Sequence, residues 1–370
     1  IAILSTMVLV TLSGGANIYA GGDYMQKALF PHDMSIQGKG VTGEQMDQAL
    51  TEFVNEQQLP VTKKVIYPYY TMGVKSRVGN QLDIFEANQK FVTPKAYILA
   101  VSEADYQSMT GKTLNLGDDE VALYQQGVKL DSKQDLQLAG QTFKIKEELK
   151  EDFIFGNLPD QMNMIVPEKI YMVLKNPSQV FSALMDKYTV NLDYYGGLNT
   201  KLSTEEQRNL RDAYQEKLHL FNLTLHENQA VYGSVTAFDK QEIKGMLGGM
   251  FFIGIFLSIV FMLGTILIIY YKQISEGYED RDRFVILQKV GLDEKQIRQT
   301  IRKQILIVFF LPLAFAFIHL TFAYHMLSLI LSALGVLNSV LMLAVTLGVC
   351  AIFFISYVIV FMITSRSYRT

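Results

Sequence analysis

The stretch Lys272–Lys303, KQISEGYEDRDRFVILQKVGLDEKQIRQTIRK, is dense in charged residues and lies between two long stretches that have none. Residues 245–271 contain no Asp, Glu, Lys or Arg, and neither do the 62 residues of 304–365. An uncharged, apolar run of about 20 residues is long enough to cross a bilayer as a helix. We therefore expect the charged stretch to connect membrane spans.

The apolar runs divide into four predicted spans. A run of 62 residues is too long for one helix, so we expect two spans in it, 304–325 and 340–365, joined by a short loop at 326–339. Residues 245–271 form another span. Residues 1–21 are also uncharged, with small polar residues that suit packing inside a larger bundle. We interpret 1–21 as a transmembrane helix cut at its start, and the chain as a fragment.

The distribution of basic residues orients these spans. The segment 272–303 carries eight Lys or Arg and the tail 366–370 carries two more, whereas the loop 326–339 carries none. Basic residues in short loops mark the cytoplasmic side. The segment and the tail are then cytoplasmic, and the large block 22–244 is extracellular. The localisation that we predict is a bacterial plasma membrane, crossed several times.

The extracellular block is long enough for its own core and holds 23 basic and 30 acidic residues. Its pattern mixes helices with strands in no repeating order, which predicts an α+β domain. The expected helices begin at capping residues, and the expected strands are rich in β-branched and aromatic side chains. These helices are 42–57, 102–110, 176–187 and 204–220, and the expected strands are 64–74, 82–92, 96–101, 121–124, 141–145 and 169–174.

Common catalytic and metal-binding motifs are missing from the sequence. It has no G-x-x-x-x-G-K-[ST] phosphate loop, no H-E-x-x-H and no G-x-S-x-G. The one cysteine, Cys350, lies within the last predicted span, so the extracellular block has neither a disulfide nor a cysteine metal site. We expect no catalytic residue, no metal, no cofactor and no nucleic-acid partner for this chain.

One amphipathic pattern lies within the charged segment itself. Arg283–Val290 reads as a short helix with its apolar residues on one side, and Gly291 suits its C-terminal cap. A second helix then continues at helical spacing into the membrane. We expect the first helix to lie along the inner surface, either as a simple linker on the lipid headgroups or as the contact for a soluble motor.

Two further groups of residues are candidates for function. Gly245, Gly248 and Gly249 interrupt the helix that leads into the second span, where they form either a hinge or a close packing point. Five tyrosines could stack on a ligand, although packing within strands is the commoner role of such residues. They are Tyr67, Tyr69, Tyr70, Tyr194 and Tyr195.

The charged segment resembles a known family. Residues 281–298, RDRFVILQKVGLDEKQIR, resemble the segment after the second span of FtsX-like ABC transporter permeases. That pattern is arginine, x, an acidic residue, isoleucine, x, x, leucine, x, x, x, glycine, and later glutamine-isoleucine. The matching residues here are Arg281, Ile286 or Val285, Leu287, Gly291, Gln296 and Ile297. The acidic position is displaced, because Asp282 precedes Arg283.

A closer resemblance is to the bacitracin-resistance type, in the residues YYKQISEGYED at 270–280, where the chain enters the charged segment, and in the large block between the first two spans. Members of that type have ten spans. The resemblance implies a separate ATPase subunit, dimeric and binding ATP with Mg²⁺, that pushes on the charged segment. It also implies a sensor histidine kinase as partner, and a ligand that is a peptide antibiotic or a lipid-linked cell-wall precursor in the membrane of a Gram-positive bacterium.

The resemblance also selects the residues that would contact the ATPase. They are Phe284, Leu287, Gln288, Lys289, Val290 and Gly291. Two alternatives remain open. One is a lipoprotein-releasing or cell-division permease of the same superfamily, which has four spans in total. The other is a membrane-anchored receptor that works without a motor.

Overall fold

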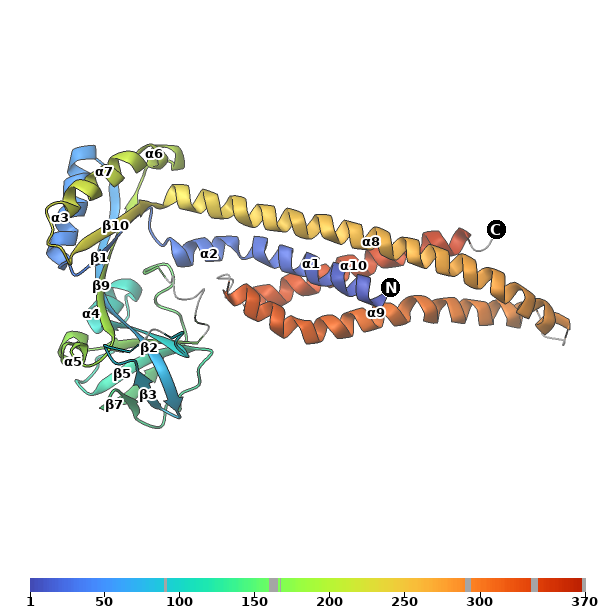
Figure 1. Ribbon diagram of the computed structural model, residues 1–370, viewed down its shortest axis with the longest axis horizontal. Coiled ribbons are helices and arrows are strands. Elements are labelled where there is room, and N and C mark those ends of the chain that lie inside the picture. Colours follow the sequence, from blue (N-terminus) through green and yellow to red (C-terminus); the bar gives the residue numbers. More distant parts are fainter. Residues whose placement is uncertain (90–91, 160–165, 167, 290–293, 334–338, 368–370) are drawn as a thin grey trace. The chain divides into compact units, whose positions relative to one another are not determined.

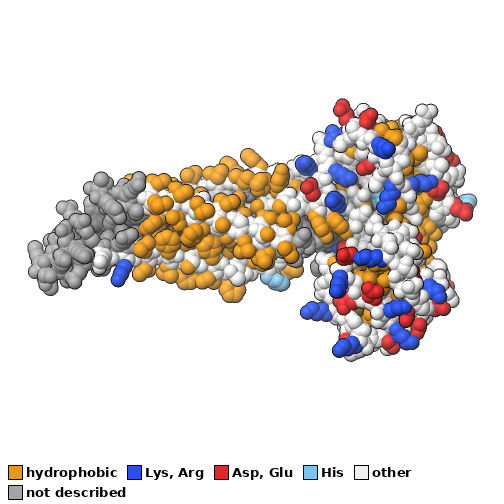
Figure 2. Space-filling model, turned by 180° about the vertical axis from the view of Figure 1, so that it is seen from behind, with side chains coloured by type: hydrophobic (Ala, Val, Ile, Leu, Met, Phe, Trp, Pro, Cys, Tyr) orange, Lys and Arg blue, Asp and Glu red, His pale blue; other side chains and the backbone are white. Residues whose placement is uncertain are grey.

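The computed structural model describes residues 1–370 except 90–91, 160–165, 167, 290–293, 334–338 and 368–370. In 273–308 and 364–367 most side chains also lie outside the description. The chain divides into two compact units. A helical unit comprises Ile1–Asp23 and Gly245–Thr370, and a sheet unit comprises Tyr24–Lys244. Figure 2 shows hydrophobic side chains over the first and most of the charged side chains on the second.

The helical unit contains α1 (Ala2–Ala20), most of α8 (Thr236–Lys289), α9 (Glu294–Ala333) and α10 (Ser339–Ser367). Each of the four includes a window long and apolar enough to cross a membrane. Apolar residues of all four meet in one cluster that includes Leu9, Ile269, Leu313 and Phe353. The fold class predicted from the sequence, four membrane helices with a large mixed α and β region, is confirmed.

Polar contacts within the helical unit join α1 to its neighbours. The side-chain amide of Asn17 donates to Thr346 of α10 at 3.0 Å, and Thr11 and Ser258 share a hydrogen bond of 2.9 Å between α1 and α8. Where α1 crosses α8, a Cβ built on Gly254 of α8 would lie 3.0 Å from the carbonyl oxygen of Thr11 on α1. Glycine therefore allows the two backbones to approach closely, as small residues do in membrane bundles.

Two helices are longer than the sequence predicted. α8 continues without a break to Lys289, so the separate surface helix expected at 283–290 is wrong. The linking residues contain no proline, and the single Gly277 does not interrupt the helix. α9 likewise continues to Ala333 through much of the expected loop 326–339. Ser328 donates to the carbonyl of His325 at 2.7 Å, so this polar residue is satisfied inside the helix.

The sheet unit is mixed, with strands and helices interleaved (Figure 1). Its strands are β1 (Met34–Lys39), β2 (Val61–Val78), β3 (Gln81–Ile84), β4 (Ala96–Ser102), β5 (Glu120–Gln126), β6 (Leu136–Leu138), β7 (Gln141–Glu148), β8 (Lys169–Leu174), β9 (Val190–Thr200) and β10 (Ala230–Val235). Its helices are α2 (Gly22–Leu29), α3 (Gly43–Gln57), α4 (Glu103–Thr110), α5 (Pro177–Met185), α6 (Thr204–Asn209), α7 (Arg211–Asn222) and the start of α8.

The ten strands form one sheet, which has an antiparallel part, called the antiparallel sheet, and a closed ring, and the long strand β2 belongs to both parts. Its first part continues the antiparallel order β10–β1–β9–β2. Its last part pairs with β3 on one side and β4 on the other, and the pairs β3–β6, β6–β7, β7–β5, β5–β8 and β8–β4 complete a closed ring of seven strands. Closure leaves this part with no open edge for another chain to join.

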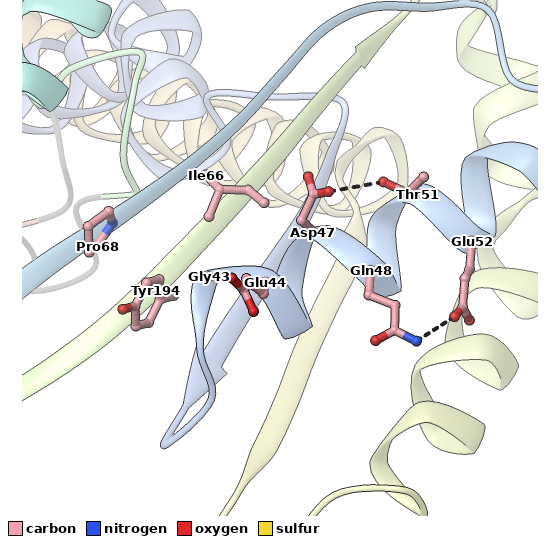
Figure 3. Close-up of a pocket in the computed structure, with 9 residues that line it drawn as sticks. All are labelled: Gly43, Glu44, Asp47, Gln48, Thr51, Glu52, Ile66, Pro68 and Tyr194. Atoms are coloured by element: carbon pink, nitrogen blue, oxygen red, sulfur yellow. Dashed lines mark hydrogen bonds between the residues drawn. The ribbon is translucent and has the colours of Figure 1, made fainter.

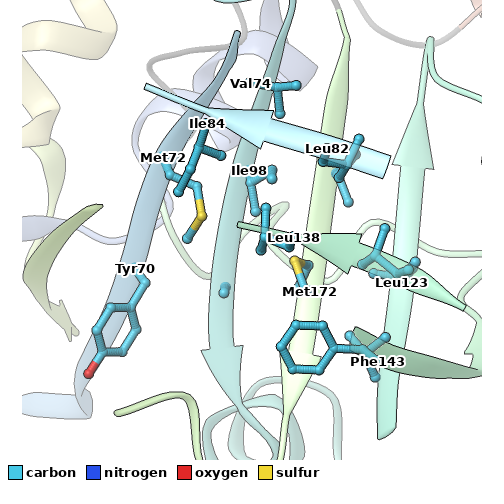
Figure 4. Close-up of a cluster of buried hydrophobic side chains, with 14 of the residues drawn as sticks. Tyr70, Met72, Val74, Leu82, Ile84, Ile98, Leu123, Leu138, Phe143 and Met172 are labelled. Atoms are coloured by element: carbon cyan, nitrogen blue, oxygen red, sulfur yellow. The ribbon is translucent and has the colours of Figure 1, made fainter. Parts of the chain in front are cut away.

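Alternate residues of the ring point to its interior and form one core. Met72 and Val74 of β2, Ile98 of β4 and Met172 of β8 belong to this core (Figure 4). The intervening residues form a second cluster on the outside, covered by α4 and the segment 149–158. The period of two in the burial pattern is that of a strand with both faces buried.

α3 and α7 pack on one face of the antiparallel sheet and form a third core with it. Thr42 caps the start of α3, as the sequence predicted, and its side chain forms a capping box with that of Gln45. The predicted helix 204–220 is instead divided at Leu210, whose N–H bonds to Gln207 three residues back rather than four. The edge of β10 is covered by α7, because Asn222 bonds both the N–H and the carbonyl of Val231 at 2.8 Å.

Candidate functional site

Three of the five candidate tyrosines are core residues. Tyr195 is fully buried, and Tyr67 and Tyr70 are 3% and 4% exposed. Tyr70 lies against Phe181 of α5, with ring centroids 5.1 Å apart. These side chains therefore lie where strand packing places them, and Tyr69 is itself partly buried against the same outer cluster as Tyr67. Tyr194 differs, because it lines an open groove.

The groove lies between α3 and the antiparallel sheet (Figure 3). It has a volume of about 620 Å³. Its floor is the sheet face, formed by Ile66 and Pro68 of β2 and by Tyr194 of β9, and Pro68 pairs directly with Tyr194 in the register. α3 forms the wall, through Gly43, Glu44, Asp47, Gln48, Thr51 and Glu52.

Local sequence explains why the floor and the wall meet here. The N-terminus of α3 is fixed by its capping box, which places Gly43 at the first helical position. A Cβ on Gly43 would lie 3.3 Å from Cε1 of Tyr194. The missing side chain therefore lets the Tyr194 ring lie against the first turn of α3. Pro68, which has no N–H to donate, is tolerated in β2 because only part of this strand has a partner on its second side.

The wall is acidic, but most of its charge is paired. Asp47 makes a 2.7 Å ion pair with Lys64, whose ammonium also donates to Thr51 at 3.0 Å. Glu52 is bound by Lys217 at 2.9 Å, and hydrogen bonds from Lys217 and Gln48 lower the pKa of Glu52. Glu44 is exposed and has no ion pair among the described residues. The groove thus combines an aromatic ring, an apolar floor and one carboxylate, that of Glu44, with no ion pair among the described residues.

A second constellation lies where the chain enters and leaves the sheet. Thr236, the first residue of α8, donates its hydroxyl to the carbonyl of His32 at 2.7 Å and its N–H to the carbonyl of Asp33 at 2.9 Å. The Asp33 carboxylate in turn accepts the N–H of Thr200 on β9 at 2.9 Å. We call His32, Asp33 and Thr236 the junction. It ties the residues before β1 to the start of α8 and both of them to β9.

His32 is the buried centre of the junction. Its side chain is 1% exposed, and its Nδ1 lies 2.9 Å from the hydroxyl of Tyr195. Burial lowers the pKa of His32 to about 4, with smaller contributions from the nearby charges of Lys63 and Lys240. The imidazole is therefore neutral at physiological pH. Gly197 lies against its ring, where a Cβ would overlap it.

The predicted hinge glycines lie in continuous helix. α8 runs through Gly245, Gly248 and Gly249 without a break, and nothing lies within 4 Å of a Cβ built on any of them. Close packing within the described residues therefore does not account for them. A hinge stays a prediction, favoured by the cost of about 1 kcal/mol that each glycine adds relative to alanine.

Comparisons with known proteins give partial matches. No family model matches the chain. The ABC transporter permease protein YxdM of Bacillus subtilis is 36% identical over 77 residues, 21% of this chain and 12% of that protein. The uncharacterized ABC transporter permease YvcS of the same organism is 30% identical over 129 residues, 35% of this chain and 19% of that protein. These homologies support an ABC transporter permease family for the chain.

The homologies and the four apolar helices together indicate a multi-pass plasma-membrane protein. The matched regions cover less than a fifth of either permease. Among solved structures, a putative lipoprotein from Bacillus anthracis aligns with 86% of its own chain and 47% of this one, at 10% identity and a TM-score of 0.26. A score of that size carries no argument about the fold.

The predicted contact for a partner ATPase falls at the end of α8. Phe284, Leu287, Gln288 and Lys289 belong to its last turns as backbone, while their side chains lie outside the description. Val290 and Gly291 lie outside the described residues altogether. Helical spacing puts Phe284, Leu287 and Gln288 on one side of α8, because residues three and four apart are neighbours on a helix surface. The ATPase contact stays a prediction.

Sequence reasoning missed both the groove wall and the junction. Glu44 and Tyr194 are 150 positions apart, and His32 and Thr236 are 204 apart. A usable signal existed at the start of α3, where the capping sequence places an acidic residue in the first turn. No three His, Cys, Asp or Glu side chains gather as a metal site in the described part of the chain.

Proposed function

We propose that this chain is the permease subunit of an ABC transporter, in which a separate dimeric ATPase binds ATP with Mg²⁺ and drives movement of the sheet unit on the outer side of the membrane. The observation that carries the proposal is α8. Its 54 residues form one helix from the strand β10, through an apolar membrane window, to Lys289. At about 1.5 Å per residue such a helix is roughly 80 Å long.

An unbroken helix of that length suits the transmission of force. Backbone hydrogen bonds run along it continuously, so a push at its cytoplasmic end moves the far end unless a hinge absorbs it. At the far end Thr236 bonds to His32 and Asp33, which continue into β1. Movement of α8 would therefore reach the sheet unit at both places where the chain connects it to the helical unit.

The finer function that we propose is resistance to cell-wall-targeting peptide antibiotics such as bacitracin, and their sensing together with a histidine kinase. The support is the resemblance of residues 270–298 to that permease type, and the partial homology to two Bacillus permeases. The ligand would be the peptide or the lipid-linked wall precursor that it holds. ATP would be hydrolysed on the partner, since the sequence has no phosphate-loop motif.

The test distinguishes loss of the contact with the ATPase from loss of membrane insertion. The variants Phe284→Asp and Leu287→Asp put a charge on the predicted contact side of α8 and should abolish both co-purification of the ATPase and resistance, while the protein stays in the membrane. Gln299→Asp adds the same charge at an exposed position of α9 and should leave both unchanged. Normal co-purification and resistance in the two α8 variants would refute the assignment.

A further inference from the structure

The groove beside α3 has the features of a cation site. A carboxylate and an aromatic face are the two groups that attract an ammonium or guanidinium, through an ion pair and a cation–π contact. Glu44 supplies the first and Tyr194 the second, and both line the same groove of about 620 Å³. Gly43 precedes Glu44 in the first turn of α3 and has no side chain that could extend over the ring.

The charge of the groove selects the sign of its ligand. Lys64 pairs with Asp47, and Lys217 is shared between Glu52 and Glu56, so Glu44 alone of the described lining carboxylates has no ion pair. The floor of Ile66 and Pro68 is apolar and would contact the stem or ring that carries the cation. A pyrophosphate headgroup would be repelled by Glu44 and would find no Lys or Arg among the described lining residues.

We propose that this groove binds a basic side chain of a cationic peptide, with the ammonium or guanidinium between Glu44 and the Tyr194 ring. The inference rests on the proposed function and decides between its two ligand classes. The sheet unit recognises the peptide through its positive charge, and the lipid-linked precursor is not held in this groove.

Substitution of the charged residues should either weaken or strengthen the binding of a cation. Glu44→Gln removes the free carboxylate, and an exposed ion pair is worth about a twofold to fivefold change in Kd. Tyr194→Leu keeps an apolar floor but removes the ring, with a loss of about the same size. Lys64→Met leaves Asp47 unpaired and should tighten binding of a cation by about twofold to fivefold. A misfolded variant cannot produce that gain.

Because the chain contains no tryptophan, the fluorescence of a tryptophan-containing peptide reports its binding. The probe is a hexapeptide of alternating lysine and tryptophan, whose fluorescence is measured against the full chain in nanodiscs of zwitterionic lipid, with empty nanodiscs subtracted. The same peptide with acetylated lysines is the neutral arm, and isoprenyl pyrophosphate is the anionic arm. Glu205→Gln is the matched control, since Glu205 is also an exposed first-turn carboxylate, on α6.

We expect the lysine peptide to bind, the acetylated peptide to bind at least fivefold more weakly, Glu44→Gln and Tyr194→Leu to weaken binding, and Lys64→Met to strengthen it. Unchanged affinity in these three variants, or no binding by the wild-type chain, overturns the proposal. So does isoprenyl pyrophosphate that competes with the peptide and binds more tightly to Glu44→Gln. The assay contains no ATPase, so it can fail while the Phe284 test succeeds, and the reverse.

Discussion

Acid should loosen the sheet unit by protonating one buried histidine, His32. Its pKa is about 4 in the folded chain against about 6.5 when unfolded. The unfolded chain therefore binds more protons between these values, and the free energy of unfolding falls as the pH falls through that window. The contribution is fully present above about pH 6.5 and lost towards pH 4. A difference of about 2.5 pKa units corresponds to about 3 kcal/mol.

The structural reason is the surroundings of the imidazole. Protonation would place a charge at a 1% exposed position, beside the Tyr195 hydroxyl and within reach of the positive charges of Lys63 and Lys240. Burial is the largest cause, because removing a charge from water is costly. The junction around His32 would open first, since its backbone carbonyl accepts the hydroxyl of Thr236 at 2.7 Å.

Hydrogen exchange of the full chain measures this change directly. Between pH 7 and pH 4.5 the protection of β9 amides, corrected for the intrinsic rate at each pH, should fall by roughly 50-fold, because 1.4 kcal/mol is a factor of ten. His32→Asn keeps a polar group near Tyr195 but does not titrate, so its protection should change by less than about threefold. His219→Asn, at an exposed position, should retain the wild-type fall. An equal fall in His32→Asn would refute the reasoning.

Two further predictions concern single polar contacts. Asn222→Ala should destabilise the sheet unit by about 1–3 kcal/mol, because it removes two 2.8 Å hydrogen bonds to Val231 and exposes the edge of β10. Urea unfolding, monitored through hydrogen exchange of the β10 amides, measures this loss. A loss below about 0.5 kcal/mol would show that water replaces the side chain. Asn17→Leu should lower the stability of the helical unit by about 0.6–1.7 kcal/mol through loss of the 3.0 Å bond to Thr346; unfolding in mixed detergent measures it, and equal or greater stability would contradict it.

The membrane helices and the capped helices of the sheet unit could be predicted from the sequence because their signals are local. Thr42 was predicted as the N-cap of α3 and Ser102 as the N-cap of α4, and both caps form. A span is an uncharged run, which composition alone reveals. The C-terminal ends of α8 and α9 were placed too early. α8 continues past its apolar window, and α9 continues into uncharged residues that were assigned to the loop 326–339.

Three of the four missed strands contain glycine, which reads as a break in a strand pattern. β1, β9 and β10 contain Gly38, Gly196 and Gly233. Each lies under a packed side chain: a Cβ on Gly196 would be 2.6 Å from Ile36, and one on Gly233 would be 2.8 Å from Leu218. Glycine is required by a close approach between segments far apart in sequence, and a single sequence gives no sign of that approach.

The strand β9 connects the two constellations that sequence reasoning could not find. Tyr194 faces the groove and the next residue, Tyr195, faces the opposite side of the sheet, where it contacts His32. Asn199 and Thr200, further along the same strand, bond Asp33 at the junction. A ligand that displaces Tyr194 therefore acts on the strand that holds the start of α8. Under the proposed function the groove and α8 affect each other, because a coupling free energy between two sites is reciprocal. Peptide binding would bias α8, and movement of α8 would change the affinity of the groove by the same factor.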